Sequence, residues 1–196
     1  MAFATVQRSK VVVSITGAQG SGKTTLARDL MERIGTNRQV APRLHVGIGK
    51  NAAALGVPLG QNANPSTIMV FAQLHLRRER AIRDGLHILD RSFVDLLAYA
   101  RRNCSHNSAL VCLVSELAVA SITNIEVVVY VPLIPELRGN RGKNESSQYR
   151  VRIDEEIRRI LTDLSINHLM VDGPREARVD QVCQHLQSLG SAAGMQ

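Results

Sequence analysis

The chain has 196 residues, 44% of them hydrophobic, which is enough for one domain with a substantial core, and we expect a single domain over residues 1–196. Apolar stretches are too short for a membrane span or a signal-peptide core, so we expect no membrane segment and a cytoplasmic location. The formal net charge of +7 favours an anionic partner, either nucleoside phosphates or a nucleic-acid backbone, but aromatic residues at 3% disfavour a base-stacking nucleic-acid platform.

A glycine-rich motif follows the first predicted strand, 10–16. Residues 17–24 read G-x-x-x-x-G-K-T and lead into a predicted helix at 24–34. The glycines permit positive φ angles and close backbone approach, so successive N–H groups can turn toward one anion at the open end of that helix. The alternative is a glycine-rich turn that carries a lysine by coincidence.

This spacing is typical of a loop that binds the phosphates of ATP. The lysine then contacts the β- and γ-phosphates, and the threonine hydroxyl is a Mg²⁺ ligand. The candidate ATP-binding residues are Gly17, Gly20, Ser21, Gly22, Lys23, Thr24 and Thr25, of which Lys23 is also a candidate catalytic residue and Thr24 a candidate metal ligand.

Short apolar runs alternate with helical patterns along the rest of the chain. The predicted strands are 10–16, 40–46, 86–89, 125–131 and 168–171, and the predicted helices are 24–34, 65–84, 92–102, 108–121, 153–164 and 175–189. This alternation predicts an α/β fold, a three-layer α/β/α sandwich with a parallel five-stranded sheet of the P-loop type. The segments 47–64 and 133–148 are rich in Gly, Pro and Asn, and we expect them to be irregular loops that border the ligand site.

An acidic and a basic residue follow the strand predicted at 86–89. Asp90 at the end of a strand beside the phosphate loop can hold Mg²⁺ or accept a proton from a substrate hydroxyl, and Arg91 can point at a phosphate. The alternative is a helix cap, with Asp90 or Ser92 at the start of the next helix. The phosphate loop elsewhere in the chain favours the catalytic interpretation.

The segment 133–152 is predicted to be a lid. From residue 138 to residue 152 it contains five Lys or Arg residues and one acid, Glu145, a local charge of +4. Such a density is repulsive unless an anion arrives, and guanidinium groups stabilise charge on a phosphoryl group during transfer. We therefore take Arg141 and Arg150 as catalytic candidates, Arg141 also as an ATP contact. A solvated basic loop is the alternative.

The cysteines and histidines show no metal-binding pattern. Cys104, Cys112 and Cys183 are odd in number, widely spaced and without a C-x-x-C pair, so we expect small core residues rather than a disulfide framework or a zinc site. The six histidines lack metal-ligand spacing such as H-x-x-x-H.

With these motifs in this order, the chain resembles the P-loop nucleoside and nucleotide kinases. Within them it is similar to the small AAA-type kinase group that includes the ribosylnicotinamide kinase domain, and more distantly to thymidylate and deoxynucleoside kinases. The residues 90–99, Asp90-Arg91-Ser92-x-x-Asp95-x-Leu97-Ala98-Tyr99, match the D-R-S-x-x-D-x-L-A-Y signature of that group. The resemblance implies that the lid arginines contact ATP and that Arg91 contacts the acceptor or the transferred group.

One departure from the family bears on the acceptor. Relatives often carry a Glu near the end of the second strand, whereas residues 33–78 of this chain contain no Asp or Glu and several basic residues. If the acceptor is a nucleoside, Asp90 must accept the hydroxyl proton by itself; if it is a monophosphate, cations such as Arg43 and Lys50 can bind it. The departure favours an acceptor that already bears a phosphate.

The same resemblance implies roles for two further residues. Gln73 lies where related kinases often read a base with an amide, and the alternative is a solvent-facing helix residue. Asp95 is a reserve carboxylate, with a surface or packing role as the alternative.

The sequence therefore predicts ATP- and Mg²⁺-dependent phosphoryl transfer to a nucleoside or, by local charge, a nucleoside monophosphate. Two alternatives remain: a nucleotide-dependent nucleic-acid-binding or regulatory protein, and a kinase that acts on polynucleotide ends or modified DNA. The sequence does not decide between a monomer and a homodimer.

Overall fold

The computed structural model describes residues 10–35, 42–134 and 145–193. The described chain contains five strands, each followed by one or two of seven α-helices, and one short 3₁₀ helix at Gly60–Asn62. The strands are β1 (Lys10–Thr16), β2 (Arg43–His45), β3 (Gly85–Asp90), β4 (Val127–Tyr130) and β5 (His168–Met170). The helices are α1 (Lys23–Gly35), α2 (Ile48–Ala54), α3 (Pro65–Arg80), α4 (Phe93–Asn103), α5 (Ser108–Ile122), α6 (Ser147–Asp163) and α7 (Arg175–Ala193).

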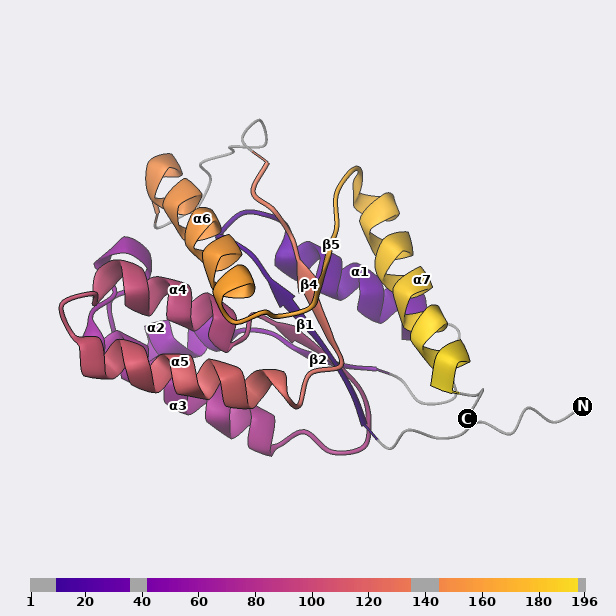
Figure 1. Ribbon diagram of the computed structural model, residues 1–196, viewed down its shortest axis with the longest axis horizontal. Coiled ribbons are helices and arrows are strands. Elements are labelled where there is room, and N and C mark those ends of the chain that lie inside the picture. Colours follow the sequence, from indigo (N-terminus) through magenta and orange to yellow (C-terminus); the bar gives the residue numbers. More distant parts are fainter. Residues whose placement is uncertain (1–9, 36–41, 135–144, 194–196) are drawn as a thin grey trace, which may run out of the picture.

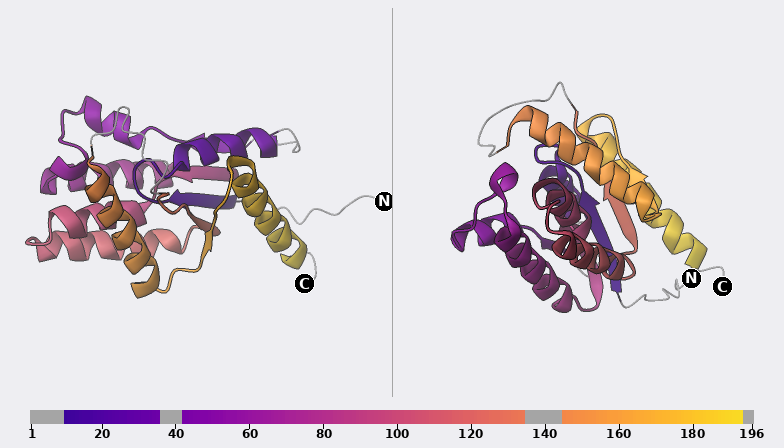
Figure 2. Two further views of the ribbon diagram at one scale, coloured as in Figure 1. Left: turned by 90° about the horizontal axis from the view of Figure 1, so that it is seen from above. Right: turned by 60° about the vertical axis from the view of Figure 1, so that its left-hand side comes forward.

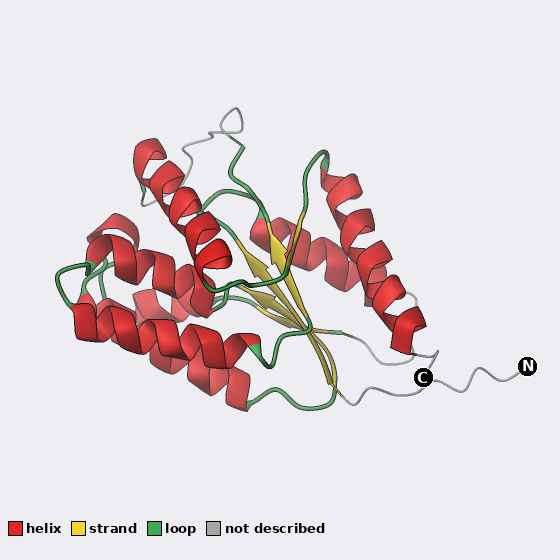
Figure 3. Ribbon diagram, in the orientation of Figure 1, coloured by secondary structure: helices red, strands yellow, loops and turns green. Residues whose placement is uncertain are grey.

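The strands form one parallel sheet in the order β2-β3-β1-β4-β5. Helices α1 and α7 lie on one side of it, and α3, α4, α5 and α6 lie on the other, as Figures 1 and 2 show. Figure 3 shows the strands as the central layer between the two groups of helices. The predicted α/β/α sandwich with a parallel five-stranded sheet is confirmed.

Alternation of side chains along the strands produces a core on each face of the sheet. In β4, Val127 and Val129 pack into the core that α1 and α7 cover, whereas Val128 and Tyr130 pack into the core of α3 to α6. Strands buried on both faces read as continuous apolar runs, which is the pattern of a parallel sheet. The two cores fix the sheet between its helices and so fix the carboxyl edge where the loops meet.

Register places the end of β3 beside the end of β1. Lys10 pairs with Gly85 and Ile15 pairs with Asp90, so the residues that follow the two strands leave the sheet together. The phosphate loop follows β1, and the D-R-S residues begin at the end of β3. Two motifs that are about seventy residues apart in the chain therefore meet at one edge of the sheet.

The segment 47–64 is not the irregular loop that its composition predicts. It contains α2 and the 3₁₀ helix, and Ile48 and Ala52 bury the inner side of α2. Alanines favour this helix, but Gly47 before it has a φ angle of 89° and no side chain caps it, so the usual start signal is missing from the sequence. By contrast α3 begins with a capping box between Asn64 and Thr67, and Pro65 is its first residue.

Smaller differences concern ends and cysteines. Helix α3 ends at Arg80 rather than extending to Gly85, and α6 begins at Ser147, inside the segment predicted to be a loop. Cys104 is buried as expected, but Cys112 is exposed on α5. In the described chain, no helix combines the length and apolar character that a membrane crossing requires.

Candidate active site

The phosphate loop is held in a shape that only glycine allows at its first position. Gly17 has a φ angle of 149°, and a side chain there would collide with the carbonyl oxygen of Val131 at the end of β4. Gly20 and Gly22 have φ angles of 83° and 101°, in the left-handed region. The loop then enters α1 at Lys23, so its N–H groups lie at the positive end of a helix.

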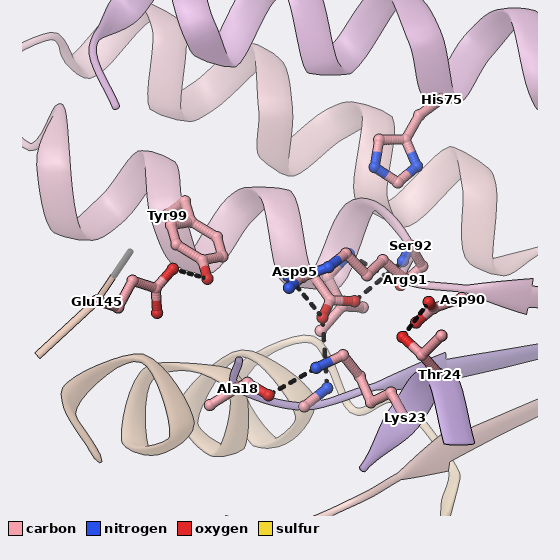
Figure 4. Close-up of polar contacts among 12 residues, drawn as sticks. Ala18, Lys23, Thr24, His75, Asp90, Arg91, Ser92, Asp95, Tyr99 and Glu145 are labelled. Carbon is pink, nitrogen blue, oxygen red and sulfur yellow. Dashed lines mark hydrogen bonds and ion pairs between the residues drawn. The ribbon is translucent and has the colours of Figure 1, made fainter. Parts of the chain in front are cut away.

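Lys23 is buried at the base of the loop, with 4% of its surface exposed. Its Nζ donates to the carbonyl oxygen of Ala18 at 2.6 Å, as Figure 4 shows. Burial, followed by repulsion from Arg91, lowers the pKa of Lys23 to about 8. A nearby anion would favour the charged form, which makes Lys23 a suitable partner for a polyphosphate.

The first threonine of α1 contacts the acid at the end of β3. Thr24 Oγ1 donates to Asp90 Oδ2 at 2.6 Å (Figure 4). Among the described residues, the other carboxylate oxygen of Asp90 is buried and has no hydrogen-bond partner. These oxygens fit a hard cation such as Mg²⁺, which prefers oxygen ligands and is usually held by one or two protein groups beside a phosphate. Thr24 and Asp90 are thus together, as the sequence predicts.

Asp95 joins the phosphate loop to α4. Its carboxylate accepts from the N–H of Gly17 at 3.3 Å and from the N–H of Ser92 at 2.9 Å, and it lies 3.9 Å from Nη1 of Arg91. Ser92 caps α4 and Asp95 completes the capping box, so the helix-cap interpretation holds for Ser92. Asp95 is 2% exposed and orients the residues around it.

A cavity of about 110 Å³ adjoins the loop between α2, α3 and α4. Gln19, Phe71, His75, Arg91, Tyr99 and Glu145 contribute to its wall. The Tyr99 hydroxyl donates to Glu145 Oε1 at 2.6 Å, and within the described chain the other oxygen of Glu145 is buried without a partner (Figure 4). Burial raises the pKa of Glu145, while Tyr99 and the cations Arg91, Lys23 and Arg150 lower it. The wall therefore carries a carboxylate that can accept a hydrogen bond.

The predicted lid residues are placed only in part. Arg150 is buried near the start of α6, where its Nη2 donates to Ser147 Oγ at 3.1 Å, and its charge acts on Glu145. Arg141 lies outside the described residues.

Of the predicted substrate residues, Arg91 lines the cavity, and Arg43, Lys50 and Gln73 do not. Arg43 on β2, Lys50 on α2 and Gln73 on α3 are exposed, whereas other residues of α3, Phe71 and His75 among them, line the cavity. In the phosphate loop, Thr25 is exposed, whereas the hydroxyl of Ser21 is buried and unpaired among the described residues.

Several residues of the site carry no local sequence signal. In the sequence, Glu145 is simply the one acid in a basic loop, and His75 is a histidine without metal-ligand spacing. Arg178 on α7 is a third example, because its Nη1 donates to the carbonyl oxygen of Ser21 at 3.2 Å and its Nε donates to that of Gly173 at 2.9 Å. It supports the phosphate loop from a helix more than 150 residues away in the chain.

Sequence comparison gives one family. The family described as AAA domain matches residues 12–178, which include the phosphate loop, the D-R-S residues and Arg178. No curated protein is significantly similar to the chain in sequence.

Solved structures of similar fold include kinases and NadR proteins. Deoxyadenosine kinase from M. mycoides, with dCMP and dCDP bound, has a TM-score of 0.65 and 11% identity, and the match covers 91% of this chain and 100% of that one. NadR protein in complex with NR has a TM-score of 0.73 and 16% identity, covering 90% of this chain and 51% of NadR; a further NadR structure holds NAD and AMP-PNP. Thymidylate kinase from Ehrlichia chaffeensis has a TM-score of 0.66 and 14% identity, covering 91% and 99% of the two chains.

Proposed function

The chain belongs to the AAA domain family and has the fold of P-loop nucleoside and nucleotide kinases, and on this premise we propose that it transfers the γ-phosphoryl group of ATP to a nucleoside. The observation that carries the proposal is the junction of three parts: the phosphate loop with buried Lys23, the contact of Thr24 with Asp90, and the adjoining cavity with Glu145 in its wall. An anion site, a cation site and an acceptor pocket are the components that phosphoryl transfer needs.

On the donor side, the loop N–H groups and Lys23 bind the β- and γ-phosphates. Thr24 and Asp90 would hold Mg²⁺, which when bound neutralises charge on the phosphates. Arg91 and Arg150 bring positive charge to the oxygens of the group in transfer, and Arg141 is proposed to join them from the lid. The presence of AMP-PNP in a NadR structure supports ATP as the donor.

On the acceptor side, the composition of the cavity wall favours a nucleoside over a nucleoside monophosphate. A hydroxyl acceptor needs a carboxylate near it, and the wall contains Glu145 and Asp95. Arg91 is the one cation among the wall residues that the structure describes, whereas Arg43 and Lys50 are exposed elsewhere. One carboxylate oxygen of Glu145 has no hydrogen-bond partner among the described residues, and its charge would disfavour a phosphate in this cavity. These features support a nucleoside as the proposed acceptor, whereas the local charge of the sequence favours a phosphorylated one.

Within this proposal the two carboxylates have different tasks. Asp90 lies beside the phosphate loop, where it would hold Mg²⁺ together with Thr24 next to the attacking hydroxyl. Glu145 and Tyr99 lie at the far wall of the cavity, where they bind another hydroxyl of the nucleoside.

The test is a panel of nucleosides and nucleoside monophosphates with γ-labelled ATP and Mg²⁺. We expect label on one or more nucleosides, a loss of roughly 100-fold or more for Lys23→Ala, and wild-type turnover for Arg28→Ala, an exposed residue of the same helix. Label only on monophosphates would refute the nucleoside, and label only on DNA ends would favour a polynucleotide kinase. Full turnover by Lys23→Ala would refute the role of the phosphate loop.

A further inference from the structure

Arg78, in the last turn of α3, makes contacts with the main chain that carries two site residues. Its Nη2 donates to the carbonyl oxygen of Arg91 at 2.8 Å, and its Nη1 is 3.5 Å from the carbonyl oxygen of Asp90. It is not one of the residues of the cavity wall. Its guanidinium group is thus aimed at the backbone behind the site rather than at a ligand.

The backbone at this point is strained. Arg91 has a φ angle of 79°, in the left-handed region that residues with a side chain rarely adopt. Such a conformation persists only where the surrounding structure holds it. On one side the N–H of Arg91 donates to the carbonyl oxygen of Ile15 in β1 at 3.0 Å, and on the other side its carbonyl accepts from Arg78. The two bonds together fix the direction in which Arg91 leaves β3.

Arg78 also determines what His75 presents to the cavity. Nη2 of Arg78 lies 3.0 Å from Nδ1 of His75, one turn earlier on α3. A guanidinium group has only donors, so Nδ1 must accept and the ring proton must lie on Nε2. His75 is 1% exposed, packs with its ring centroid 5.1 Å from that of Phe93, and forms part of the cavity wall. What it can offer a ligand there is a hydrogen-bond donor.

We propose that Arg78 is a positioning residue for phosphoryl transfer, which holds Asp90 and Arg91 through their carbonyl oxygens and fixes His75 as a donor toward the acceptor. The proposal rests on the proposed function, because Asp90, Arg91 and the cavity are its components. It deepens that function by joining the donor and acceptor sides of the site through one side chain. A nucleoside whose base or sugar presents an acceptor atom to His75 is the ligand class that this arrangement selects.

The experiment compares Arg78→Met and Arg78→Lys with the wild type and with Arg77→Met, an exposed neighbour on the same helix. Steady-state kinetics are measured with the best nucleoside from the panel, together with MgATP affinity, the Mg²⁺ concentration for half-maximal rate, the melting temperature, and ¹⁵N spectra of the His75 ring.

The expected result separates positioning from stability. Arg78→Met should lower kcat/KM for the nucleoside by roughly 10–100-fold and raise the Mg²⁺ requirement, because a small displacement of aligned groups is costly in transfer reactions. Its MgATP affinity should change by less than about 3-fold, since the phosphate loop is intact. Arg78→Lys should recover part of the rate, and Arg77→Met should equal the wild type. The His75 ring should be the Nε2–H tautomer in the wild type and a mixture in Arg78→Met.

Two results would overturn the proposal. One is wild-type kinetics in a folded Arg78→Met; the other is a loss of rate that follows the loss of folded protein alone, with the Mg²⁺ requirement and the His75 tautomer unchanged. If the wild-type chain itself transfers no phosphoryl group, the proposed function fails first, and that outcome is distinguished by the wild-type arm of the panel.

Discussion

At the scale of single residues, the ammonium group of Lys23 donates a hydrogen bond to the Ala18 carbonyl oxygen. Burial and the charge of Arg91 lower the pKa of Lys23 to about 8. A bound triphosphate adds negative charge next to the ammonium group and raises that pKa again. Above pH 8 nucleotide binding must then take up a proton, and affinity must fall as pH rises. Calorimetric titration with MgATP at pH 8.5, in two buffers of different ionisation enthalpy, should show uptake of roughly 0.5–1 proton.

The control for this prediction is a change of pH. At pH 6.5 Lys23 is already charged, so the heats in the two buffers should agree once corrected for dilution. Lys23→Met should abolish the uptake at pH 8.5. Heats that are independent of buffer at pH 8.5 would show that binding does not change the protonation of Lys23.

Glu145 gives a second prediction at this scale. Glu145→Gln keeps the shape of the side chain and its contact with Tyr99 but removes the charge, so the acceptor loses a charge-assisted hydrogen bond. We expect a fall of roughly 10–100-fold in kcat/KM for the nucleoside with the KM for ATP unchanged, because the change lies on the acceptor wall. Steady-state kinetics with each substrate varied in turn measure this. An equal effect on both substrates would place Glu145 outside the acceptor site.

At the scale of elements, α4 is tied to the phosphate loop through Asp95, which accepts from Ser92 and Gly17 and lies near Arg91. Asp95→Ala removes the capping box and leaves buried N–H groups without a partner. The cost should be about 2–4 kcal/mol in the free energy of unfolding, measured by denaturant titration. Glu155→Ala, an exposed residue of α6, should change stability by less than about 0.5 kcal/mol. A similar small value for Asp95→Ala would mean that the loop and α4 are held together by other contacts.

Elements with strong local signals are predictable from the sequence, and those without such signals are not. β1 has the predicted bounds because an apolar run is stopped by glycine, and α3 starts at Pro65 because Asn64 and Thr67 cap it. α2 is missed because its stability comes from burying Ile48 and Ala52 under other elements rather than from caps. A segment rich in Gly, Pro and Asn can therefore still contain a short helix.

The site divides in the same way. The phosphate loop and the pairing of Thr24 with Asp90 are predictable, because one motif is contiguous and parallel register brings the ends of adjacent strands together. The acceptor wall is not, since Glu145, Tyr99 and His75 meet only after α3, α4 and the start of α6 have packed. Arg43 and Lys50 are exposed away from the cavity wall, because local charge does not determine where a side chain lies in the fold.

At the scale of the whole molecule, the net charge of +7 keeps a nucleic-acid partner as the rival interpretation. We expect random duplex DNA to bind weakly, with Kd above about 10 µM at physiological salt, and to lose affinity steeply as salt rises, because the attraction is to the phosphate backbone alone. DNA should leave nucleoside turnover unchanged. Fluorescence anisotropy across a salt series, with and without ATP, measures this. Submicromolar, ATP-dependent binding at physiological salt would favour the regulatory protein instead.

Lys23 and Thr24 already donate to oxygens of the chain itself, the Ala18 carbonyl and the Asp90 carboxylate. Under the proposed function, the ammonium group of Lys23 has two further protons to donate to a triphosphate, and the oxygens of Thr24 and Asp90 would turn to Mg²⁺. An anion beside Lys23 would also offset the repulsion between Lys23 and Arg91.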